Sequence, residues 1–255
     1  MHPASINDRQ DRAFAAHILD LFTIAEQKYI PRFSGFLDMH QSTLARQITS
    51  GQSHRSFLFF GGHPGSERVM LGVFPPYEEP DPDAFPIVPL TLRFRLEDSI
   101  GHRDLLGSLM GLELRREAIG DILLEPGRAV LFAAKSVAPV ILSELTKVGR
   151  WGVKVSQGPP EQLPALHQYQ DKNINVSATR LDCIVAAVVG CSREKAAQRV
   201  RAQLVSVNGL TIGETAHILH AGDIISIRGY GKFLFAQETG STRKGRLCLL
   251  FKKYI

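Results

Sequence analysis

The stretch "TRLDCIVAAVVGCSREKAAQRVRAQLVSVNG", residues 179–209, decides the fold of the last third of the chain. Its apolar residues recur at helical spacing on either side of a Gly-Cys-Ser turn, which predicts two short helices. Ser192 is predicted to cap the second helix, because its hydroxyl can accept a hydrogen bond from an amide of the first turn. The closing apolar run and the Asn-Gly pair predict a strand and a turn.

The second of these helices carries more positive than negative charge. Lys195 and Arg199 lie opposite its apolar stripe, and Arg193 lies at its N-terminal end. Arg201 flanks the stripe. Glu194 is the only acidic residue of the helix, so ion pairs along it cannot neutralise the cations. The cations form either a solvated helix face or a surface that meets phosphate.

The whole C-terminal third of the chain is basic. Residues 172–255 hold 13 Lys/Arg and 5 Asp/Glu, which gives a net charge of +8. The remaining residues hold the other 17 Lys/Arg and 20 Asp/Glu, which gives −3 and a total of +5. This asymmetry predicts a polyanionic partner for the C-terminal third.

Composition and cysteine usage narrow the class of protein. A hydrophobic content of 44% and a charged content of 22% are typical of soluble globular proteins. We find no apolar run long enough to cross a bilayer and no basic-then-apolar signal at the N-terminus. The three cysteines are far apart and odd in number, which argues against a disulfide framework. We therefore expect a cytoplasmic protein without a membrane span.

Two connectors that contain proline divide the chain. Residues 74–89 hold six prolines and four acidic residues, and residues 156–173 form a second, polar connector. The sequence therefore predicts three domains, at residues 1–76, 87–156 and 174–255.

The first two domains are predicted to mix helices and strands. A helical pattern followed by two strands, joined by "GGHPGSE", indicates an N-terminal α/β domain. The middle domain has the order β-α-β-β-α-β, the ferredoxin-like plan that many RNA-binding modules share. Its first strand is predicted over Leu90–Leu96, half-buried because apolar and polar residues alternate. The predicted fold class is α+β, with an N-terminal α/β region, a ferredoxin-like (RRM-like) middle domain and a small C-terminal domain.

Motifs of catalysis are weak in this sequence. The chain has neither a Walker-type phosphate loop nor a strand-linked dinucleotide fingerprint. No Cys or His pair has the spacing of a zinc site, and no nucleophile is spaced to suggest a triad. The glycines of residues 61–65 could cradle a phosphate, but Gly-Pro clusters favour a hairpin turn. We predict no catalytic residue, no metal and no cofactor.

A second basic feature is "RGYGKF", residues 228–233. Its two glycines let the backbone approach a ligand closely between Arg228 and Lys232. Phe233 is predicted to pack in the core, and Tyr230 either there or at a hairpin edge. Together with the basic helix, these cations come from several elements of one small domain, the pattern of a phosphate-binding surface. The residues alone favour nucleic-acid binding.

Four motifs of the C-terminal third together resemble the S-four domain, a small RNA-binding module of the αL type. They are Arg-Leu-Asp at the first helix, Ser-Arg-x-x-Ala on the second, Val-x-Val-Asn-Gly, and Gly-Asp-x-Ile. The resemblance implies an RNA-binding face, whereas Asp182 is expected to support the fold. Where the module usually has Gly and then a basic residue, this chain has Gln203-Leu204, so Gln203 must adopt a left-handed backbone or end the helix differently. The RNA-binding residues carried over are Arg180, Ser192, Arg193, Lys195, Gln198, Arg199 and Asn208, joined by Arg228 and Lys232 from the basic turn.

The wider chain is similar to the bacterial YlmH-like RNA-binding proteins. The stretches that carry the similarity, in order, are "RFSGFLD", "GGHPGSERVMLGVFP", "GHRDLLGSLMGLELRREAIGDILL", "LTKVGRWGVKV" and "RGYGKF". The resemblance implies an RNA-binding middle domain, no catalysis, and rescue of large ribosomal subunits obstructed by peptidyl-tRNA. The implied partners are rRNA or tRNA and the large ribosomal subunit, and cell-division proteins have also been attached to the family.

Two other functions stay open. An RNA-modifying enzyme of the pseudouridine synthase or methyltransferase type could use the C-terminal module as a tether. However, the synthase loop resembles Arg-Leu-Asp-x-x-Thr-Ser-Gly, whereas the Arg-Leu-Asp here continues into a predicted helix, and no glycine-rich methyltransferase loop is found. A division-associated adaptor would instead bind a protein through the first two domains.

Overall fold

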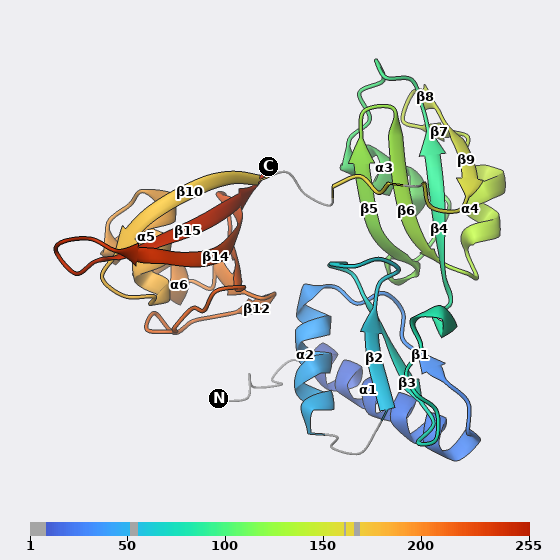
Figure 1. Cartoon of the computed structure of the whole chain (residues 1–255), viewed down its shortest axis with the longest axis horizontal. Coiled ribbons are helices and arrows are strands. Elements are labelled where there is room, and N and C mark those ends of the chain that lie inside the picture. Colours follow the sequence, from blue (N-terminus) through green and yellow to red (C-terminus); the bar gives the residue numbers. More distant parts are fainter. Residues whose placement is uncertain (1–8, 52–55, 161, 166–168) are drawn as a thin grey trace. The chain divides into compact units, whose positions relative to one another are not determined.

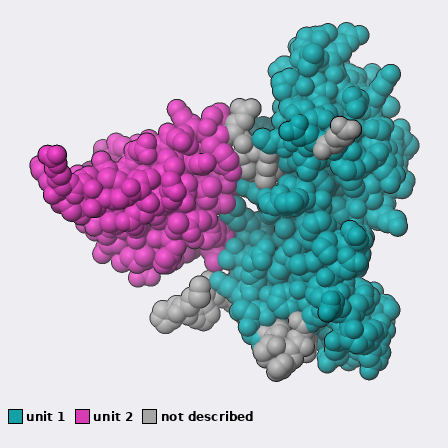
Figure 2. All heavy atoms as spheres, viewed as in Figure 1, with its two compact units in different colours: residues 1–166 teal, residues 167–255 magenta. Residues whose placement is uncertain are grey.

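The computed structural model describes residues 9–51, 56–160, 162–165 and 169–255, which form two compact units (Figures 1 and 2). Unit 1 spans residues 1–166 and unit 2 spans residues 167–255. Both units combine helices with antiparallel sheets, which confirms the α+β class. The division into three domains stays a prediction, and unit 1 contains the first two of them. In the described residues, no helix is long and apolar enough to span a bilayer.

The central strand of the first sheet of unit 1 is buried on both faces. The sheet has the order β1-β3-β2, and every residue of its central strand β3 is buried. Leu71 and Val73 of β3 pack against Ile18 and Phe22 of helix α1. Because β3 is covered on both sides, its sequence shows no apolar-polar alternation. The elements of this part are α1 (Arg9–Lys28), β1 (Arg32–Phe33), α2 (Met39–Ser50), β2 (Ser56–Phe60) and β3 (Met70–Phe74).

The second sheet of unit 1 has the predicted ferredoxin-like topology. Its strand order is β5-β6-β4-β9 with all neighbours antiparallel, and α3 and α4 pack on one face. The elements are η1 (Pro82–Ala84), β4 (Ile87–Arg93), α3 (His102–Gly111), η2 (Arg116–Ala118), β5 (Ile119–Glu125), β6 (Arg128–Ala134), α4 (Ala138–Glu144), β7 (Lys147–Val148), β8 (Trp151–Gly152) and β9 (Lys154–Gln157).

Strand β4 differs from the prediction in position and burial. It spans Ile87–Arg93 instead of Leu90–Leu96, because a turn in which the Asp98 carboxylate accepts from the Arg95 amide follows it at once. Thr91, predicted to face solvent, is buried, and its hydroxyl donates to the Gly158 carbonyl at 2.8 Å. The middle of the strand, Leu90 to Leu92, is therefore covered on both faces, whereas Arg93 at its end is exposed.

The two sheets of unit 1 share a cluster rich in phenylalanine. In β6, Leu131 faces the helices, whereas Val130 and Phe132 point to the other side. There they meet Met70 and Phe74 of β3. The first sheet and the second sheet are thus held together by one hydrophobic core, which explains why they form a single compact unit.

The loop "GGHPGSE" between β2 and β3 is organised by a buried carboxylate. Asp121 of β5 accepts hydrogen bonds from the backbone amides of Glu67 and Arg68 at 2.9 and 3.0 Å, and lies 3.1 Å from Nε2 of His63. The Arg68 side chain donates to three backbone carbonyls, and its burial beside Arg116 lowers its pKa to about 10. An internal anion therefore already occupies the loop amides, which supports a structural turn and not a phosphate cradle.

Substituting Asp121 by Ala should destabilise unit 1 by about 3 kcal/mol, because two part-buried amides and the buried His63 ring lose their partner. Urea unfolding followed by fluorescence of Trp151, the single tryptophan, measures this change. The control is Asp20→Ala, which removes an exposed carboxylate of α1. Equal unfolding midpoints for the two variants would contradict the role given to Asp121.

Unit 2 packs two helices on one face of a six-stranded antiparallel sheet. The strand order is β10-β15-β14-β13-β11-β12 (Figure 1). Alternate residues of β11 and β13, among them Val205 and Ile225, pack under α5 and α6, while those between them face outward. The elements are β10 (Tyr169–Val176), α5 (Leu181–Val189), α6 (Arg193–Arg201), β11 (Val205–Val207), β12 (Leu210–Thr211), β13 (Ile224–Ile227), β14 (Gly231–Ser241) and β15 (Leu247–Tyr254).

Both predicted helices of the opening stretch are confirmed, and so is the departure at the end of the second. Ser192 caps α6, its hydroxyl accepting from the Lys195 amide at 3.3 Å. Gln203 has φ of 57°, the left-handed conformation. Its amide donates to the Val200 carbonyl and the Leu204 amide to the Arg199 carbonyl, which is a Schellman motif. The chain thus uses the usual geometry without the usual glycine.

Replacing Gln203 by Gly should stabilise the end of α6 by about 1 kcal/mol, since the left-handed conformation is costly for a residue with a Cβ atom. Amide hydrogen exchange in peptides from α6 and β11 should become roughly fivefold slower at those amides that exchange through local unfolding of the helix end. Gln203→Ala keeps the backbone cost and should leave exchange unchanged. Faster exchange in the glycine variant would show that the side chain of Gln203 makes a larger contribution than its backbone conformation costs.

Candidate nucleic-acid interface

The carboxylate of Asp182, in the first turn of α5, joins the two helices of unit 2. Arg180 donates to both carboxylate oxygens, each at 3.1 Å, and Nε of Arg193 donates to Oδ2 at 2.9 Å. The Cys183 amide donates to Oδ1 at 2.9 Å. The Asp182 side chain is 5% exposed, whereas those of Arg180 and Arg193 are 36% and 57% exposed. One buried anion therefore positions two surface cations that come from different helices.

The protonation of this cluster is fixed at neutral pH. Burial raises the pKa of Asp182, but the hydrogen bonds from Arg180, Arg193 and Cys183 outweigh burial and lower that pKa to about 2. The hydrogen bond to Asp182 also raises the pKa of Arg180. Both guanidinium groups therefore remain charged, and each keeps N–H groups that Asp182 does not use, because arginine has five.

Arg199 is held by a different partner. Its guanidinium lies 4.7 Å from the ring centroid of Tyr230, and its Nη2 donates to the tyrosine hydroxyl at 3.2 Å. Tyr230 belongs to the turn between β13 and β14, so this contact ties α6 to that turn. Tyr230 is 38% exposed, whereas Phe233 is buried, which confirms the core position predicted for Phe233. The sequence did not predict the Arg199–Tyr230 contact, because the two residues meet only in the tertiary structure.

Lys195 and Gln198 complete the outward face of α6. Both are exposed, and neither side chain forms a hydrogen bond or ion pair with another described residue. Asp182 thus brings Arg180 and Arg193 together, and Lys195, Gln198 and Arg199 follow along α6 itself. We call this set the helix face, and it consists of Arg180, Ser192, Arg193, Lys195, Gln198 and Arg199.

Asn208 has a structural position in the fold. It has φ of 49° and begins the tight turn to β12. Its Nδ2 donates to Asp223 at 2.8 Å, and its Oδ1 accepts from the Ile224 amide at 2.9 Å. Both ends of the amide thus stabilise the turn, and contact with RNA stays a prediction for this residue.

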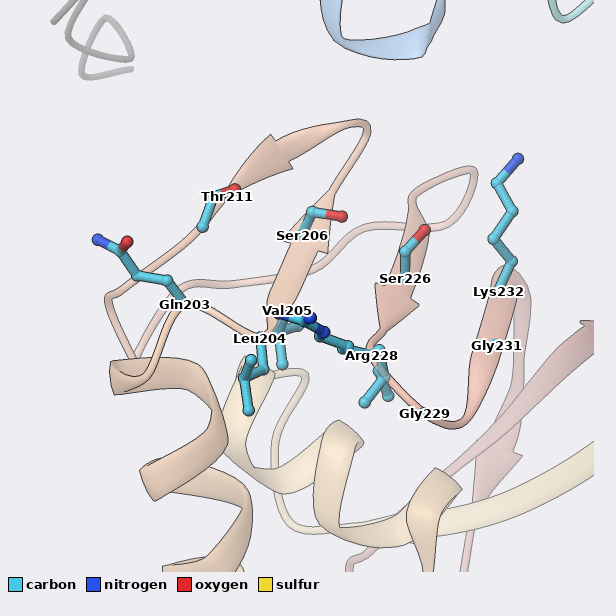
Figure 3. A pocket seen from close by; sticks show the side chains of 11 residues that line it. Gln203, Leu204, Val205, Ser206, Thr211, Ser226, Arg228, Gly229, Gly231 and Lys232 are labelled. Carbon is cyan, nitrogen blue, oxygen red and sulfur yellow. The ribbon is translucent and has the colours of Figure 1, made fainter. Parts of the chain in front are cut away.

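Arg228 and Lys232 lie together but apart from the Asp182 cluster. They line a hollow of about 410 Å³ at the ends of β11, β13 and β14, together with Gln203, Ser206 and Ser226 (Figure 3). The sequence placed these two cations in one surface with the helices. The structure places both in the lining of this hollow, with Lys232 pointing away from the helices and Arg228 beside Val205 (Figure 3).

Comparisons with known proteins agree with this architecture. Residues 83–162 match the family model described as "Putative RNA-binding domain in YlmH", and residues 179–225 match the S4 domain. The chain is 29% identical over 248 residues to "Ribosome-associated protein quality control protein P2" of Bacillus subtilis (strain 168), an alignment that covers 96% of each chain. The solved structure "Cell division protein ylmH from Streptococcus pneumoniae" matches with a TM-score of 0.51 and 23% identity, over 60% of this chain and 93% of that chain. At this identity the structural likeness shows the fold alone.

The helices and sheet of unit 2, matched by the S4 family model, define an RNA-binding protein of the S-four class. Within that class, the chain is similar to the YlmH proteins, since residues 83–162 match the model of their putative RNA-binding domain and the chain aligns over nearly its full length with the Bacillus subtilis relative.

Replacing Asp182 by Asn should make the stability of unit 2 less dependent on pH below about pH 4. The pKa of Asp182 is lower in the folded protein than in the unfolded chain, so its stabilising contribution is complete above about pH 4. The contribution is lost as the pH falls from about 4 to about 2. Hydrogen exchange of α5 and α6 peptides, followed from pH 6 to pH 2.5, measures this loss in the wild type and its absence in the variant.

The control for this measurement is Asp171→Asn, which changes an exposed carboxylate of β10. Its exchange should follow the wild-type pH dependence. A wild-type pH dependence in Asp182→Asn as well would mean that the carboxylate is not ionised against the two arginines.

Proposed function

We propose that this protein is a non-catalytic RNA-binding protein that acts on structured RNA of the ribosome, rRNA or tRNA, in the quality control of obstructed large subunits. The observation that carries the proposal is the helix face, where Asp182 positions Arg180 and Arg193 for phosphate. The name of the Bacillus subtilis relative, which concerns ribosome-associated quality control, supports the choice of RNA. A cytoplasmic location follows from the proposal, because ribosomes are there.

Phosphate contacts supply most of the affinity in this proposal. A guanidinium that is fixed along one edge loses less conformational entropy when its remaining N–H groups meet a phosphate. Asp182 fixes Arg180 and Arg193 in this way, and Tyr230 does the same for Arg199. Selectivity would then come from the shape of folded RNA, since the deep, narrow major groove of an A-form helix keeps side chains away from its base edges.

The state of Asp182 supports the absence of catalysis. In the alternative of a pseudouridine synthase, the Asp of the Arg-Leu-Asp stretch would act on the substrate. Here the carboxylate is buried inside α5 and is engaged by three donors. Mass spectrometry of ribosomal and transfer RNA from a deletion strain should therefore find every modification present. Loss of one modification, restored by the wild-type gene, would favour the enzyme.

Binding of a tRNA transcript should weaken about 10- to 100-fold in the double variant Arg193→Ala, Arg199→Ala, because two phosphate contacts are lost. The slope of log affinity against log salt should fall by roughly two, about 0.9 for each contact. Fluorescence anisotropy between 50 and 200 mM salt measures both values.

The control Arg9→Ala, Arg12→Ala removes the same charge from the exposed side of α1 in unit 1. It should keep the wild-type affinity and slope, which separates local contacts from net charge. If the helix-face variant also keeps both, the helix face does not bind RNA.

A role as a partner of cell-division proteins stays a hypothesis. The words "cell division" belong to the name of the Streptococcus pneumoniae protein, whose likeness to this chain concerns the fold. No feature of the described residues favours that role over RNA binding.

A further inference from the structure

A row of hydroxyl groups crosses the outer face of the unit 2 sheet and ends at a lysine. Thr211 pairs with Ser206, Ser206 pairs with Ser226, and Ser226 pairs with Lys232, so four neighbouring strands each contribute one residue. The residues beside them in sequence, such as Val205 and Ile227, are buried under the helices. Figure 3 shows the four side chains pointing to the side of the sheet away from the helices.

The row continues into two tyrosines on the next two strands. Nζ of Lys232 lies 4.9 Å from the ring centroid of Tyr254 in β15, and Tyr254 pairs with Tyr169 in β10. The two rings meet edge to face, with centroids 5.0 Å apart. We call this row the outer strip, and it consists of Thr211, Ser206, Ser226, Lys232, Tyr254 and Tyr169.

The serine and threonine hydroxyls of the strip make no hydrogen bond within the described part of the fold. Within the described residues, the hydroxyls of Thr211, Ser206 and Ser226 form no hydrogen bond, although Ser206 and Ser226 are half-buried in the hollow of about 410 Å³. Arg228 and Lys232 line the same hollow, and no carboxylate is among the described residues that do so. The hollow is therefore positive, concave and supplied with groups that both donate and accept.

The carboxylate of β10 nearest to this row is Asp171, which stands opposite Lys252 in the register. Lys252 also places its ammonium 5.6 Å from the ring of Tyr169. The tyrosine end of the strip is therefore bordered by one acidic and one basic residue without net charge. The positive charge comes from Lys232 of the strip and from Arg228, which lines the same hollow. This charge suits an anionic polymer.

We propose that the outer strip is a second RNA surface, which binds a single-stranded segment. The exposed Tyr169 and the half-buried Tyr254 can stack bases, Lys232 and Arg228 can meet phosphates, and the hydroxyl row can bond to ribose 2′-hydroxyls. This inference rests on the proposed function and adds to it, because the helix face and the strip lie on different sides of the domain. The turn that carries Tyr230 connects them, since it follows Arg228 and precedes Lys232.

The test uses the full chain with three labelled probes: a 12-nucleotide oligouridylate, the deoxy oligomer of the same sequence, and a tRNA transcript. Tyr169→Leu with Tyr254→Leu should weaken oligouridylate binding about tenfold, through lost stacking. Ser206→Ala with Ser226→Ala should bring the affinities for the RNA and deoxy oligomers close to each other, because the 2′-hydroxyl loses its partners. Both variants should bind tRNA within about twofold of the wild type.

The helix-face variant Arg193→Ala, Arg199→Ala is measured beside them, and circular dichroism confirms that every variant is folded. If both strip variants bind oligouridylate as the wild type does, with the same preference for RNA over DNA, the strip proposal is overturned while the helix face stands. Unchanged tRNA binding in the helix-face variant instead contradicts the proposed function, whatever the strip variants do.

The strip proposal is also overturned if the strip binds a protein and not RNA. In that case the strip variants bind all three probes normally but no longer retain proteins of purified large subunits after nuclease treatment. The serine variant separates the two cases well, because two missing hydroxyls change the RNA-to-DNA ratio and remove little protein-contact area.

Discussion

The carboxylate of Asp182 accepts hydrogen bonds from two arginines that lie on different helices, Arg180 before α5 and Arg193 at the start of α6. The buried carboxylate fixes the direction of the two partly exposed arginine side chains. If Asp182 were absent, both cations would be ordinary mobile surface charges, which contribute little specificity. The candidate interface therefore depends on an anion that never needs to touch RNA.

Unit 1 uses a buried carboxylate for a comparable purpose. Asp121 accepts from two amides of the loop before β3 and faces His63, so a glycine-rich loop is fixed to a strand more than fifty residues later in the sequence. In both units, an acid that is paired inside the protein orders groups that could otherwise bind an external anion. The two carboxylates differ in the donors that they leave for an external anion. In unit 1 the loop amides already bind Asp121, whereas in unit 2 the two arginines keep N–H groups that Asp182 does not bind.

The sheet of unit 2 has an apolar inner face and a polar outer face. Its inner residues form the core under α5 and α6, and its outer residues form a row of hydroxyls, a lysine and tyrosines. Strand geometry requires this separation, because successive side chains point to opposite faces. Lys232 lies on the outer face of this sheet, whereas Arg180 and Arg193 meet at Asp182 beside the helices. The contact between Arg199 and Tyr230 joins α6 to the turn before Lys232, and one RNA surface made of all these cations stays a prediction.

Much of this protein was determined by its sequence alone. The apolar spacing and the Ser192 cap predicted both helices of unit 2, and the unusual Gln203 indicated the left-handed backbone that the structure has. These features are local, since each depends on residues within a few positions.

Only the tertiary structure decided which distant side chains meet. Arg199 reaches Tyr230, and Ser206, Ser226 and Lys232 align, through pairing between strands that the sequence separates. The burial of Thr91 and the early end of β4 likewise depend on Gly158 and on the turn at Asp98. Periodicity describes one face of one element, whereas register and packing depend on all the elements at once.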